Sequence, residues 1–150
     1  MKELEDHLLL VFTGIKRRAM EVEKQKLGSM AGNSANLASL HRMVEQGHTR
    51  LAGGGSLEPF GRLLDEGWRL KRGLCAGVTN DEIEMMYATG LANGAWGGKL
   101  LGAGGGGFLL FCAPPERHAA IAEALPGKHR VKVSLASPGS AVVFSEPQSV

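Results

Sequence analysis

The sequence predicts an α+β domain in which helices cover a small, mostly antiparallel sheet. Short apolar runs at residues 7–13 and 108–112, and an alternating segment over 129–135, predict strands. Between the first two runs, several segments place their apolar residues at helical spacing instead. The 150 residues show no internal repeat and no linker-like stretch, so we expect one domain over residues 1–150.

The N-terminal third is expected to hold one strand and two helices. Residues 7–13 form an apolar run that a Thr-Gly pair closes, as at the end of a buried strand. Residues 16–27 look helical, and a glycine ends them. A second helix is expected from Asn33 to the glycine triplet at 53–55, with these apolar positions: Leu37, Leu40, Val44 and Leu51.

Two further helices are expected before the chain becomes glycine-rich. Ser56 is expected to cap the first of them, whose apolar face is formed by Phe60, Leu63, Leu64 and Trp68. Thr79 and Glu82 have the spacing of a capping box at the start of the second. Its apolar stripe consists of Ile83, Met86, Tyr87 and Leu91.

In the C-terminal third, the sequence predicts strands on either side of a short helix. Residues 108–112 form an apolar strand, and Pro114-Pro115 can open a helix to about residue 125, because proline is tolerated in a first turn. Residues 129–135 alternate as a half-exposed strand does. A Pro-Gly turn then precedes a last strand at 141–144.

Charge and composition exclude several classes of protein. The 17 Lys and Arg residues nearly balance 15 Asp and Glu residues, and aromatic residues make up 5%, so we expect no nucleic-acid partner. The longest apolar stretch is of strand length, so we expect no membrane contact. Cys75 and Cys112 lack metal or redox spacing and are expected to be small apolar residues in a reducing, cytoplasmic setting.

Glycine is the compositional anomaly of the chain. It accounts for 22 residues, and nine of these lie between Gly90 and Gly107, so the enrichment indicates one local device. Consecutive glycines allow a backbone to approach a ligand closely and to turn several N–H groups toward it. A phosphate group is therefore a physically reasonable neighbour of this segment.

Two common phosphate-binding motifs do not fit. The dinucleotide spacing is present at Gly102, Gly104 and Gly107, but it must open a helix, and a strand is predicted next. A P-loop around Gly98-Lys99 fails because Asn93 stands where its first glycine is required, and Leu100 replaces the Ser or Thr that would hold Mg²⁺.

A third arrangement does fit. The run from Gly94 through Lys99 and the unbroken Gly-Ala-Gly-Gly-Gly-Gly of residues 102–107 to Phe108 resembles the C-terminal glycine motif of GHMP kinases. Within that family, Phe108, Pro114-Pro115-Glu116, residues 8–15 and residues 68–72 resemble the heptose-7-phosphate kinase branch. Trp96 departs from the pattern, because a smaller aliphatic residue is usual there.

The resemblance implies a two-lobed kinase of which this chain is the C-terminal, ferredoxin-like lobe. In that family the N-terminal lobe carries a Gly/Ser-rich ATP-binding loop, the groups that bind Mg²⁺ and those that activate the acceptor hydroxyl. No stretch of this sequence resembles that loop. We therefore expect the N-terminal lobe to be a partner of this chain, to hold the catalytic residues, and to bind most of the ATP and Mg²⁺.

The resemblance also assigns candidate site residues. Contacts to nucleotide or substrate are expected from Gly102, Ala103, Gly104, Gly105, Gly106, Gly107 and Lys99. Cationic partners for a sugar phosphate are expected at Lys71 and Arg72, beside Trp68, with Thr13 as a further contact. Structural explanations stay open: the glycines can serve a tight turn, and basic residues favour the C-terminal end of any helix. His41 and His48 are expected to be structural, with no metal site.

The implied reaction is transfer of the ATP γ-phosphate to the anomeric hydroxyl of a heptose 7-phosphate. Another acceptor, fucose or galactose, stays open, as does a non-catalytic module that binds ligand or complements a separate lobe. An isolated C-terminal lobe would expose apolar surface that its partner covers. We therefore expect the isolated domain to self-associate.

Overall fold

The computed structural model describes residues 1–16, 30–125, 127–135 and 140. Its helices are α1 (Lys2–Asp6), α3 (Ser34–Ala52), α4 (Glu58–Arg72), α5 (Asp81–Ala92) and α6 (His118–Glu123). Its strands are β1 (Leu8–Phe12), β2 (Gly97–Leu100), β3 (Phe108–Cys112) and β4 (Arg130–Val131). Short 3₁₀ turns are η1 (Met30–Asn33), η2 (Ala76–Val78) and η3 (Pro115–Arg117). The helix expected at 16–27 and the strand expected at 141–144 lie largely or wholly outside the described residues.

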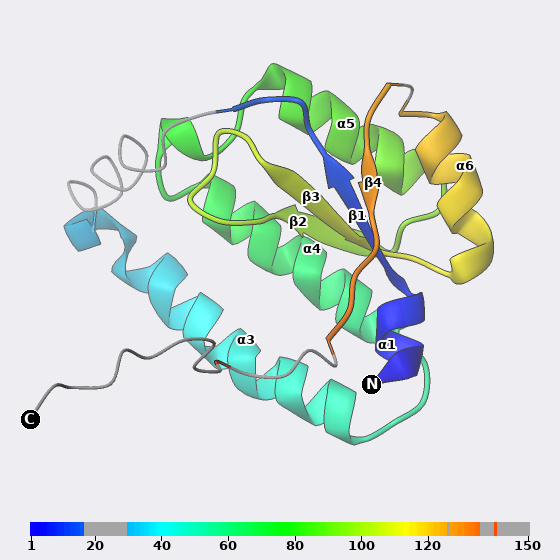
Figure 1. The fold of residues 1–150 in the computed structure, drawn as a ribbon. Helices are drawn as coiled ribbons and strands as arrows, with labels where there is room; N and C mark the ends of the chain where they lie inside the picture. The colour runs from blue at the N-terminus through cyan, green and yellow to red at the C-terminus, as the bar shows by residue number, and fades with distance from the viewer. Residues whose placement is uncertain (17–29, 126, 136–139, 141–150) are drawn as a thin grey trace, which may run out of the picture.

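The four strands form one antiparallel sheet in the order β2-β3-β1-β4 (Figure 1). This order, with helices between β1 and β2 and again between β3 and β4, is the split βαβ arrangement of ferredoxin-like folds. The register places Leu10 opposite Leu110 and Phe12 opposite Phe108. The predicted α+β fold with an antiparallel sheet is confirmed.

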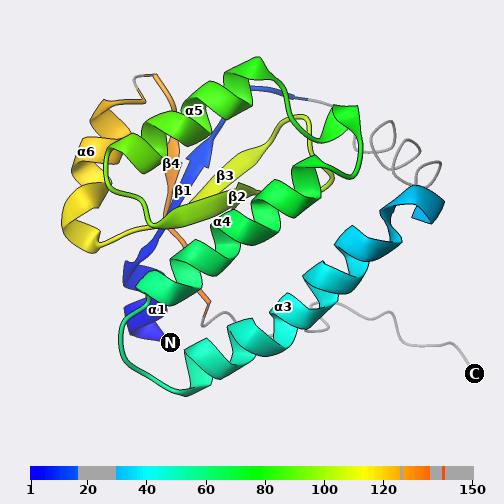
Figure 2. The same ribbon diagram turned by 180° about the vertical axis from the view of Figure 1, so that it is seen from behind.

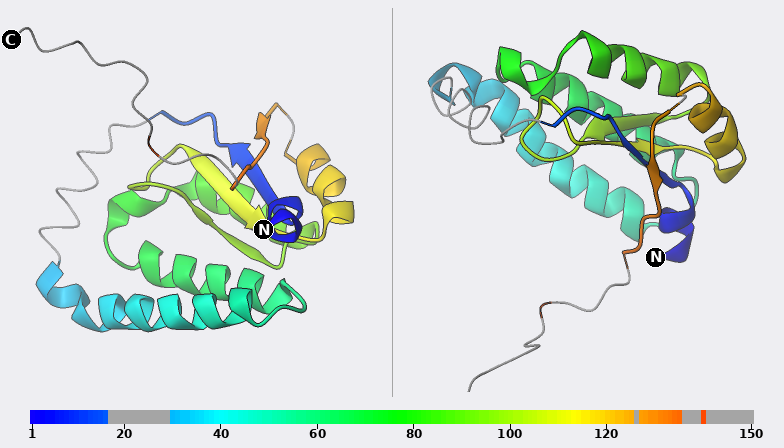
Figure 3. Two further views of the ribbon diagram at one scale, coloured as in Figure 1. Left: turned by 60° about the horizontal axis from the view of Figure 1, so that its bottom comes forward. Right: turned by 45° about the horizontal axis from the view of Figure 1, so that its top comes forward.

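The helices cover one face of the sheet. Seen from behind, α4 and α5 lie across it, and α6 flanks its β1–β4 side (Figure 2). Helix α3 runs along α4, farther from the strands (Figure 3), and none of its residues is buried. No described helix covers the opposite face, where Leu10, Phe12 and Phe108 are half-buried. Among the described helices, none is both long and apolar enough to span a membrane.

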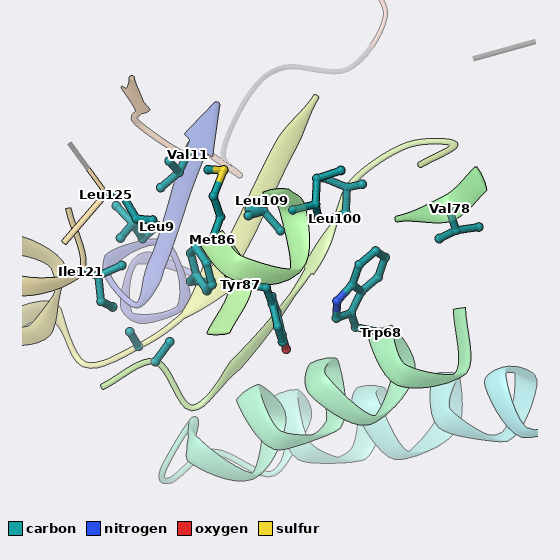
Figure 4. Close-up of a cluster of buried hydrophobic side chains, with 14 residues drawn as sticks. Leu9, Val11, Trp68, Val78, Met86, Tyr87, Leu100, Leu109, Ile121 and Leu125 are labelled. Atoms are coloured by element: carbon teal, nitrogen blue, oxygen red, sulfur yellow. The ribbon is translucent and has the colours of Figure 1, made fainter. Parts of the chain in front are cut away.

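The core lies between the sheet and α4, α5 and α6 (Figure 4). Its largest fully buried side chain is Trp68, which is 1% exposed and packs against Tyr87 with ring centroids 6.1 Å apart. The Tyr87 hydroxyl donates to Asp65 Oδ1 at 2.8 Å or to the Gly98 carbonyl at 3.1 Å, and burial raises the pKa of this phenol. One aromatic side chain thus joins α5 to both α4 and β2.

Several glycines outside the glycine-rich run of residues 102–107 allow helices to pack closely on the sheet. A Cβ at Gly90 would overlap the Phe111 ring, and one at Gly97 would overlap the Gly61 carbonyl. The missing side chains therefore allow α5 to lie on β3 and α4 to lie on β2. The expectation that the glycine enrichment reflects one device is too simple, because these residues bring helices onto the sheet.

Some element boundaries differ from the sequence-based expectations. Strand β2 was not predicted, because its Gly-Gly start has low β propensity and forms through contact with α4. The strand expected over 129–135 shrinks to two residues, since β4 pairs only with Leu10 and Val11. Helix α1 was also not predicted.

The predicted helix caps also need correction. Asn80 Oδ1, not Thr79, accepts the Ile83 N–H and caps α5, because Asn80 occupies the N-cap position. Thr79 donates its hydroxyl to Glu84 instead. Leu57 occupies the N-cap position of α4, one residue later than the predicted Ser56. Ser56 Oγ still accepts the Glu58 N–H, at 3.2 Å.

Replacing Gly90 by alanine should destabilise the domain, because the new methyl group would overlap Phe111. Overpacking of this kind costs about 1–3 kcal/mol. Gly47→Ala is the matched control, since its Cβ would lie 3.6 Å from Leu63 Cδ2, an ordinary contact, in the interior of α3. That control should gain about 0.5–1 kcal/mol from helix propensity. Urea unfolding measures both, and equal effects of the two substitutions would contradict the packing of Gly90 on Phe111.

Candidate nucleotide-phosphate site

Residues 102–107, the glycine loop, join β2 to β3 at one end of the sheet (Figure 1). The backbone φ angle is positive at Gly102 (+68°), Gly104 (+117°), Gly105 (+74°) and Gly107 (+98°). L-residues adopt such angles at a cost, and the most positive ones are nearly restricted to glycine. The run of glycines is therefore required by the path of the backbone.

Two amides of the loop are used by the protein itself. The Gly105 N–H donates to the Val78 carbonyl at 2.8 Å, and the Gly107 N–H donates to the Ile15 carbonyl at 3.0 Å. Within the described residues, four loop amides donate to no protein acceptor: that of the exposed Gly102, that of the buried Gly104, and those of the half-buried Ala103 and Gly106. The loop can therefore offer only some of its amides to an anion, fewer than its sequence suggests.

A hollow of about 450 Å³ lies beside the loop, and we call it the loop hollow. Its lining includes the half-buried Phe12 and Phe108 rings, whose centroids are 5.1 Å apart, together with Ile15, Lys16 and most of the glycine loop. Because Phe12 and Phe108 point to the uncovered face of the sheet, the hollow opens on that face. Apolar rings, amide donors and an ammonium suit a small molecule that carries phosphate.

Lys16 was missed as a site residue. Its sequence neighbours alternate in charge, which predicts a solvated helix face. The structure places it shortly after β1, beyond Thr13, Gly14 and Ile15, where it lines the loop hollow. The signal that could have found it is its position three residues after Thr13, at the end of a strand that pairs with the strand following the loop.

Lys99 lies away from the loop hollow. It lines a second hollow of about 580 Å³ between α3 and α4, the α3–α4 groove, together with mostly apolar residues such as Met43, Phe60 and Leu64. Lys71 lines this groove too. The structure therefore does not bring Lys99 together with the glycine loop in one cavity, although β2 leads directly into that loop.

The side chain of Lys71 binds backbone carbonyls at the beginning of the loop. It lies in the last turn of α4, and its Nζ donates to the Leu100 carbonyl at 3.0 Å and to the Gly102 carbonyl at 2.7 Å. The ammonium also lies 5.9 Å from the centroid of the Trp68 ring. This cation is thus already engaged where the strand becomes the loop.

Arg72, the next residue, forms an ion pair with Glu84 of α5. Its guanidinium carbon also lies 5.8 Å from the Trp68 ring centroid. Glu84 accepts the Thr79 hydroxyl as well, at 2.7 Å. These contacts join the end of α4 to the beginning of α5.

Thr13 is fully buried at the other end of the loop. Its hydroxyl donates to the Gly107 carbonyl at 2.9 Å and accepts the Ile15 N–H at 3.2 Å. Its own carbonyl accepts Lys128 Nζ at 2.7 Å, and the same ammonium forms an ion pair with Glu82 at 2.9 Å. Thr13 thus contacts the loop backbone directly.

The cysteines fit the expectation of apolar packing. Cys112 is buried on β3, and desolvation raises the pKa of its thiol to about 11. Cys75 is partly exposed. Across the described ranges, no group of His, Cys, Asp and Glu side chains could hold a metal ion.

Comparison with known proteins agrees with this arrangement. The family described as "GHMP kinases C terminal" matches residues 36–132, which include α4, α5, the glycine loop and β3. The chain belongs to the GHMP kinase family. This confirms the resemblance carried by the glycine motif.

Named relatives of this GHMP kinase domain are sugar kinases. The D-glycero-alpha-D-manno-heptose 7-phosphate kinase of Campylobacter jejuni is 35% identical over 126 residues, which are 82% of this chain and 37% of that protein. The bifunctional fucokinase/GDP-fucose pyrophosphorylase of Arabidopsis thaliana is 32% identical over 117 residues, 75% of this chain and 11% of that protein. The chain therefore spans only a minor part of either relative.

The fold agrees with mevalonate kinases. The L. major enzyme, solved in complex with R-mevalonate, matches with a TM-score of 0.69 and 24% identity, covering 82% of this chain and 40% of that one. The Methanococcus jannaschii enzyme matches with a TM-score of 0.64 and 18% identity, covering 87% of this chain and 40% of that one. Both support the fold of the GHMP kinase C-terminal domain.

Alanine substitutions at two loop positions should differ in their effect on stability, because the two positions differ in both close packing and backbone angle. At Gly104 a Cβ would lie 2.7 Å from the Val78 carbonyl, with φ at +117°, whereas at Gly102 nothing lies within 4 Å and φ is +68°. Gly102→Ala should cost about 1 kcal/mol of unfolding free energy, the price of a left-handed residue. Gly104→Ala should cost more, on the order of 3 kcal/mol, from strain plus overlap. Equal losses in urea unfolding would contradict close packing on Val78.

Thiol labelling should distinguish the two cysteines. Because the pKa of Cys112 is raised to about 11, its reactive thiolate is only about one part in a thousand at pH 8. Ellman's reagent should therefore titrate one thiol quickly in the folded chain and the second only after denaturation. Cys75→Ser is the control, and rapid labelling of this folded variant would contradict burial of Cys112.

Proposed function

We propose that this chain is the C-terminal lobe of an ATP-dependent sugar kinase that phosphorylates the anomeric hydroxyl of a heptose 7-phosphate. The observation that carries the proposal is the 35% identity over 82% of the chain with a heptose 7-phosphate kinase. The family match over residues 36–132 includes the glycine loop and Phe108, which form part of the lining of the loop hollow.

In this proposal the loop hollow contributes one wall of the nucleotide-phosphate cleft. The N–H groups of Ala103 and Gly106 would donate to phosphate oxygens, with residues 102–107 lining the cleft and Lys16 adding positive charge. Phosphoryl transfer depends mainly on positioning and on stabilisation of negative charge, which fixed amides and an ammonium can supply. ATP and Mg²⁺ would be held mainly by the N-terminal lobe, which would also carry the catalytic residues.

Contacts to the sugar phosphate are less directly supported. Lys99 would add charge from the side of the α3–α4 groove, and Arg72 would reach a sugar phosphate only beside its ion pair with Glu84. The contacts of Lys71 and Thr13 favour a role in holding the loop over a direct contact with substrate. The assignment of these four residues to substrate stays a prediction.

The acceptor could instead be fucose. Two relatives support this alternative, the Arabidopsis protein and the L-fucokinase/L-fucose-1-P guanylyltransferase of Bacteroides fragilis, each 32% identical over about three quarters of the chain. Two further alternatives have weaker support: galactose as the acceptor, and a non-catalytic module that complements a separate lobe.

The same proposal predicts two kinds of protein partner, the N-terminal lobe and, for the isolated chain, a second copy of itself. The N-terminal lobe would approach the loop hollow from the uncovered face of the sheet, in a cytoplasmic enzyme. On that face the apolar side chains of Leu10, Phe12 and Phe108 are half-buried, and on the other side of the sheet α3 exposes Val44, which is 67% exposed, and Leu51. The isolated chain should therefore self-associate, and a monomer at all concentrations in light scattering would contradict this.

A hybrid enzyme tests the acceptor. This chain would replace the matching region of the Campylobacter heptose 7-phosphate kinase, and ADP release would be measured with heptose 7-phosphate, fucose and galactose. We expect turnover with heptose 7-phosphate at least tenfold above either other sugar. The unaltered Campylobacter enzyme is the reference, and its N-terminal region without this chain is the blank. A preference for fucose would favour the alternative, and turnover by this chain alone would contradict a catalytic centre in the other lobe.

A further inference from the structure

We propose that Lys71 and the Thr13–Lys128 pair are positioning residues that hold the glycine loop in its shape before any ligand binds. The proposal rests on the proposed nucleotide-phosphate role of that loop. In this proposal these side chains do not contact a sugar phosphate themselves. They act on ligand binding through the loop that they hold.

The first anchor is Lys71. Its ammonium donates to the carbonyls of Leu100, the last residue of β2, and of Gly102, the first residue of the loop. A cation that holds two carbonyls two residues apart restricts the backbone between them, because both oxygens must point to one side. Gly102 then turns with φ at +68°.

The second anchor is a chain of hydrogen bonds at the end of the loop. The Gly107 carbonyl accepts the buried Thr13 hydroxyl at 2.9 Å, and the Thr13 carbonyl accepts the Lys128 ammonium at 2.7 Å. Because Thr13 is fully buried, its hydroxyl cannot turn to water without breaking this contact. The loop is therefore fixed at both ends by different parts of the chain.

Lys128 of the second anchor and Arg72, the residue after the first anchor, both contact one short segment, residues 78–84. Glu84 pairs with Arg72, the neighbour of Lys71, while Glu82 pairs with Lys128. The middle of the loop is held by the same segment, since the Val78 carbonyl accepts the Gly105 N–H. The middle of the loop is thus bonded to this segment directly, its end is joined to the segment through Thr13 and Lys128, and its beginning lies beside the Arg72–Glu84 pair. The core holds the segment in place through the fully buried Ile83.

This arrangement uses some loop amides and leaves others for a ligand. The amides of Gly105 and Gly107 donate to the protein, whereas those of Ala103 and Gly106 have no acceptor among the described residues, on a backbone held at both ends. A glycine-rich loop without anchors would sample many conformations, and a ligand would have to order it on binding. The anchors therefore act on affinity by preorganising the donors.

The ligand-free chain provides the direct test. Amide hydrogen exchange of residues 102–107 is compared with that of α5 in the wild type and in Lys71→Met and Lys128→Met variants. Both variants should raise loop exchange at least tenfold while exchange in the α5 core stays within about twofold. Lys71→Arg, which keeps charge and donors, should retain most of the protection. Arg69→Met is the matched control, because Arg69 shares α4 but pairs with Asp65 away from the loop.

Unchanged loop exchange in Lys71→Met would overturn the proposal. An equal rise in the loop and in the α5 core would also overturn it, since Lys71 would then support the whole fold and not the loop. Thr13→Val extends the test to the buried hydroxyl, and Lys128→Met covers the case in which the threonine variant does not fold.

A titration with ADP separates this proposal from the proposed function. If wild-type loop amides shift on addition of ADP, Lys71→Met should bind it at least fivefold more weakly, and equal affinity would overturn the positioning role. If the wild-type loop is ordered, depends on Lys71 and binds neither ADP nor inorganic phosphate, the positioning role stands. That result would count against the nucleotide-phosphate assignment alone.

Discussion

Close approach of one backbone to another is the constraint on which the rest of this structure depends. The glycine loop runs against Val78 and Ile15 so closely that a Cβ at Gly104 or Gly106 would lie 2.6–2.7 Å from one of their carbonyl oxygens. The same constraint recurs where β2 meets α4 at Gly97 and Gly61. Because backbones in contact can exchange hydrogen bonds directly, these glycines determine both where α4 lies and which loop amides remain for a ligand.

The framework was largely predictable from the sequence. Residues 108–112 were predicted as a strand and form β3, because an apolar run bounded by glycines and prolines has few alternatives. The apolar faces of α4 and α5 were also found, since burial of Trp68 and Tyr87 follows from helical spacing. Strand β2 was not, because Gly97 and Gly98 have weak local preference and become a strand only through tertiary contact.

The site was predictable in part, for a related reason. The glycine loop could be recognised because positive φ angles favour glycine at residues 102, 104, 105 and 107, and close contact with Ile15 favours it at residue 106. The roles of Lys71 and Lys128 could not, since each acts on backbone atoms more than 25 residues away in sequence. Residue type indicates that a lysine carries charge. Whether that charge meets a ligand or a carbonyl depends on where the fold places the helix that carries it.

The conformational entropy that is lost when a loop is ordered explains why the anchors matter. Fixing a backbone residue costs about 1–2 kcal/mol, so ordering six residues costs on the order of 10 kcal/mol. Millimolar binding corresponds to only about 4 kcal/mol, so a ligand that had to order the whole loop would gain little. When folding of the core places residues 78–84, the loop is ordered as part of the same event. A phosphate would then meet donors that folding has already oriented, and its binding energy would remain available for affinity.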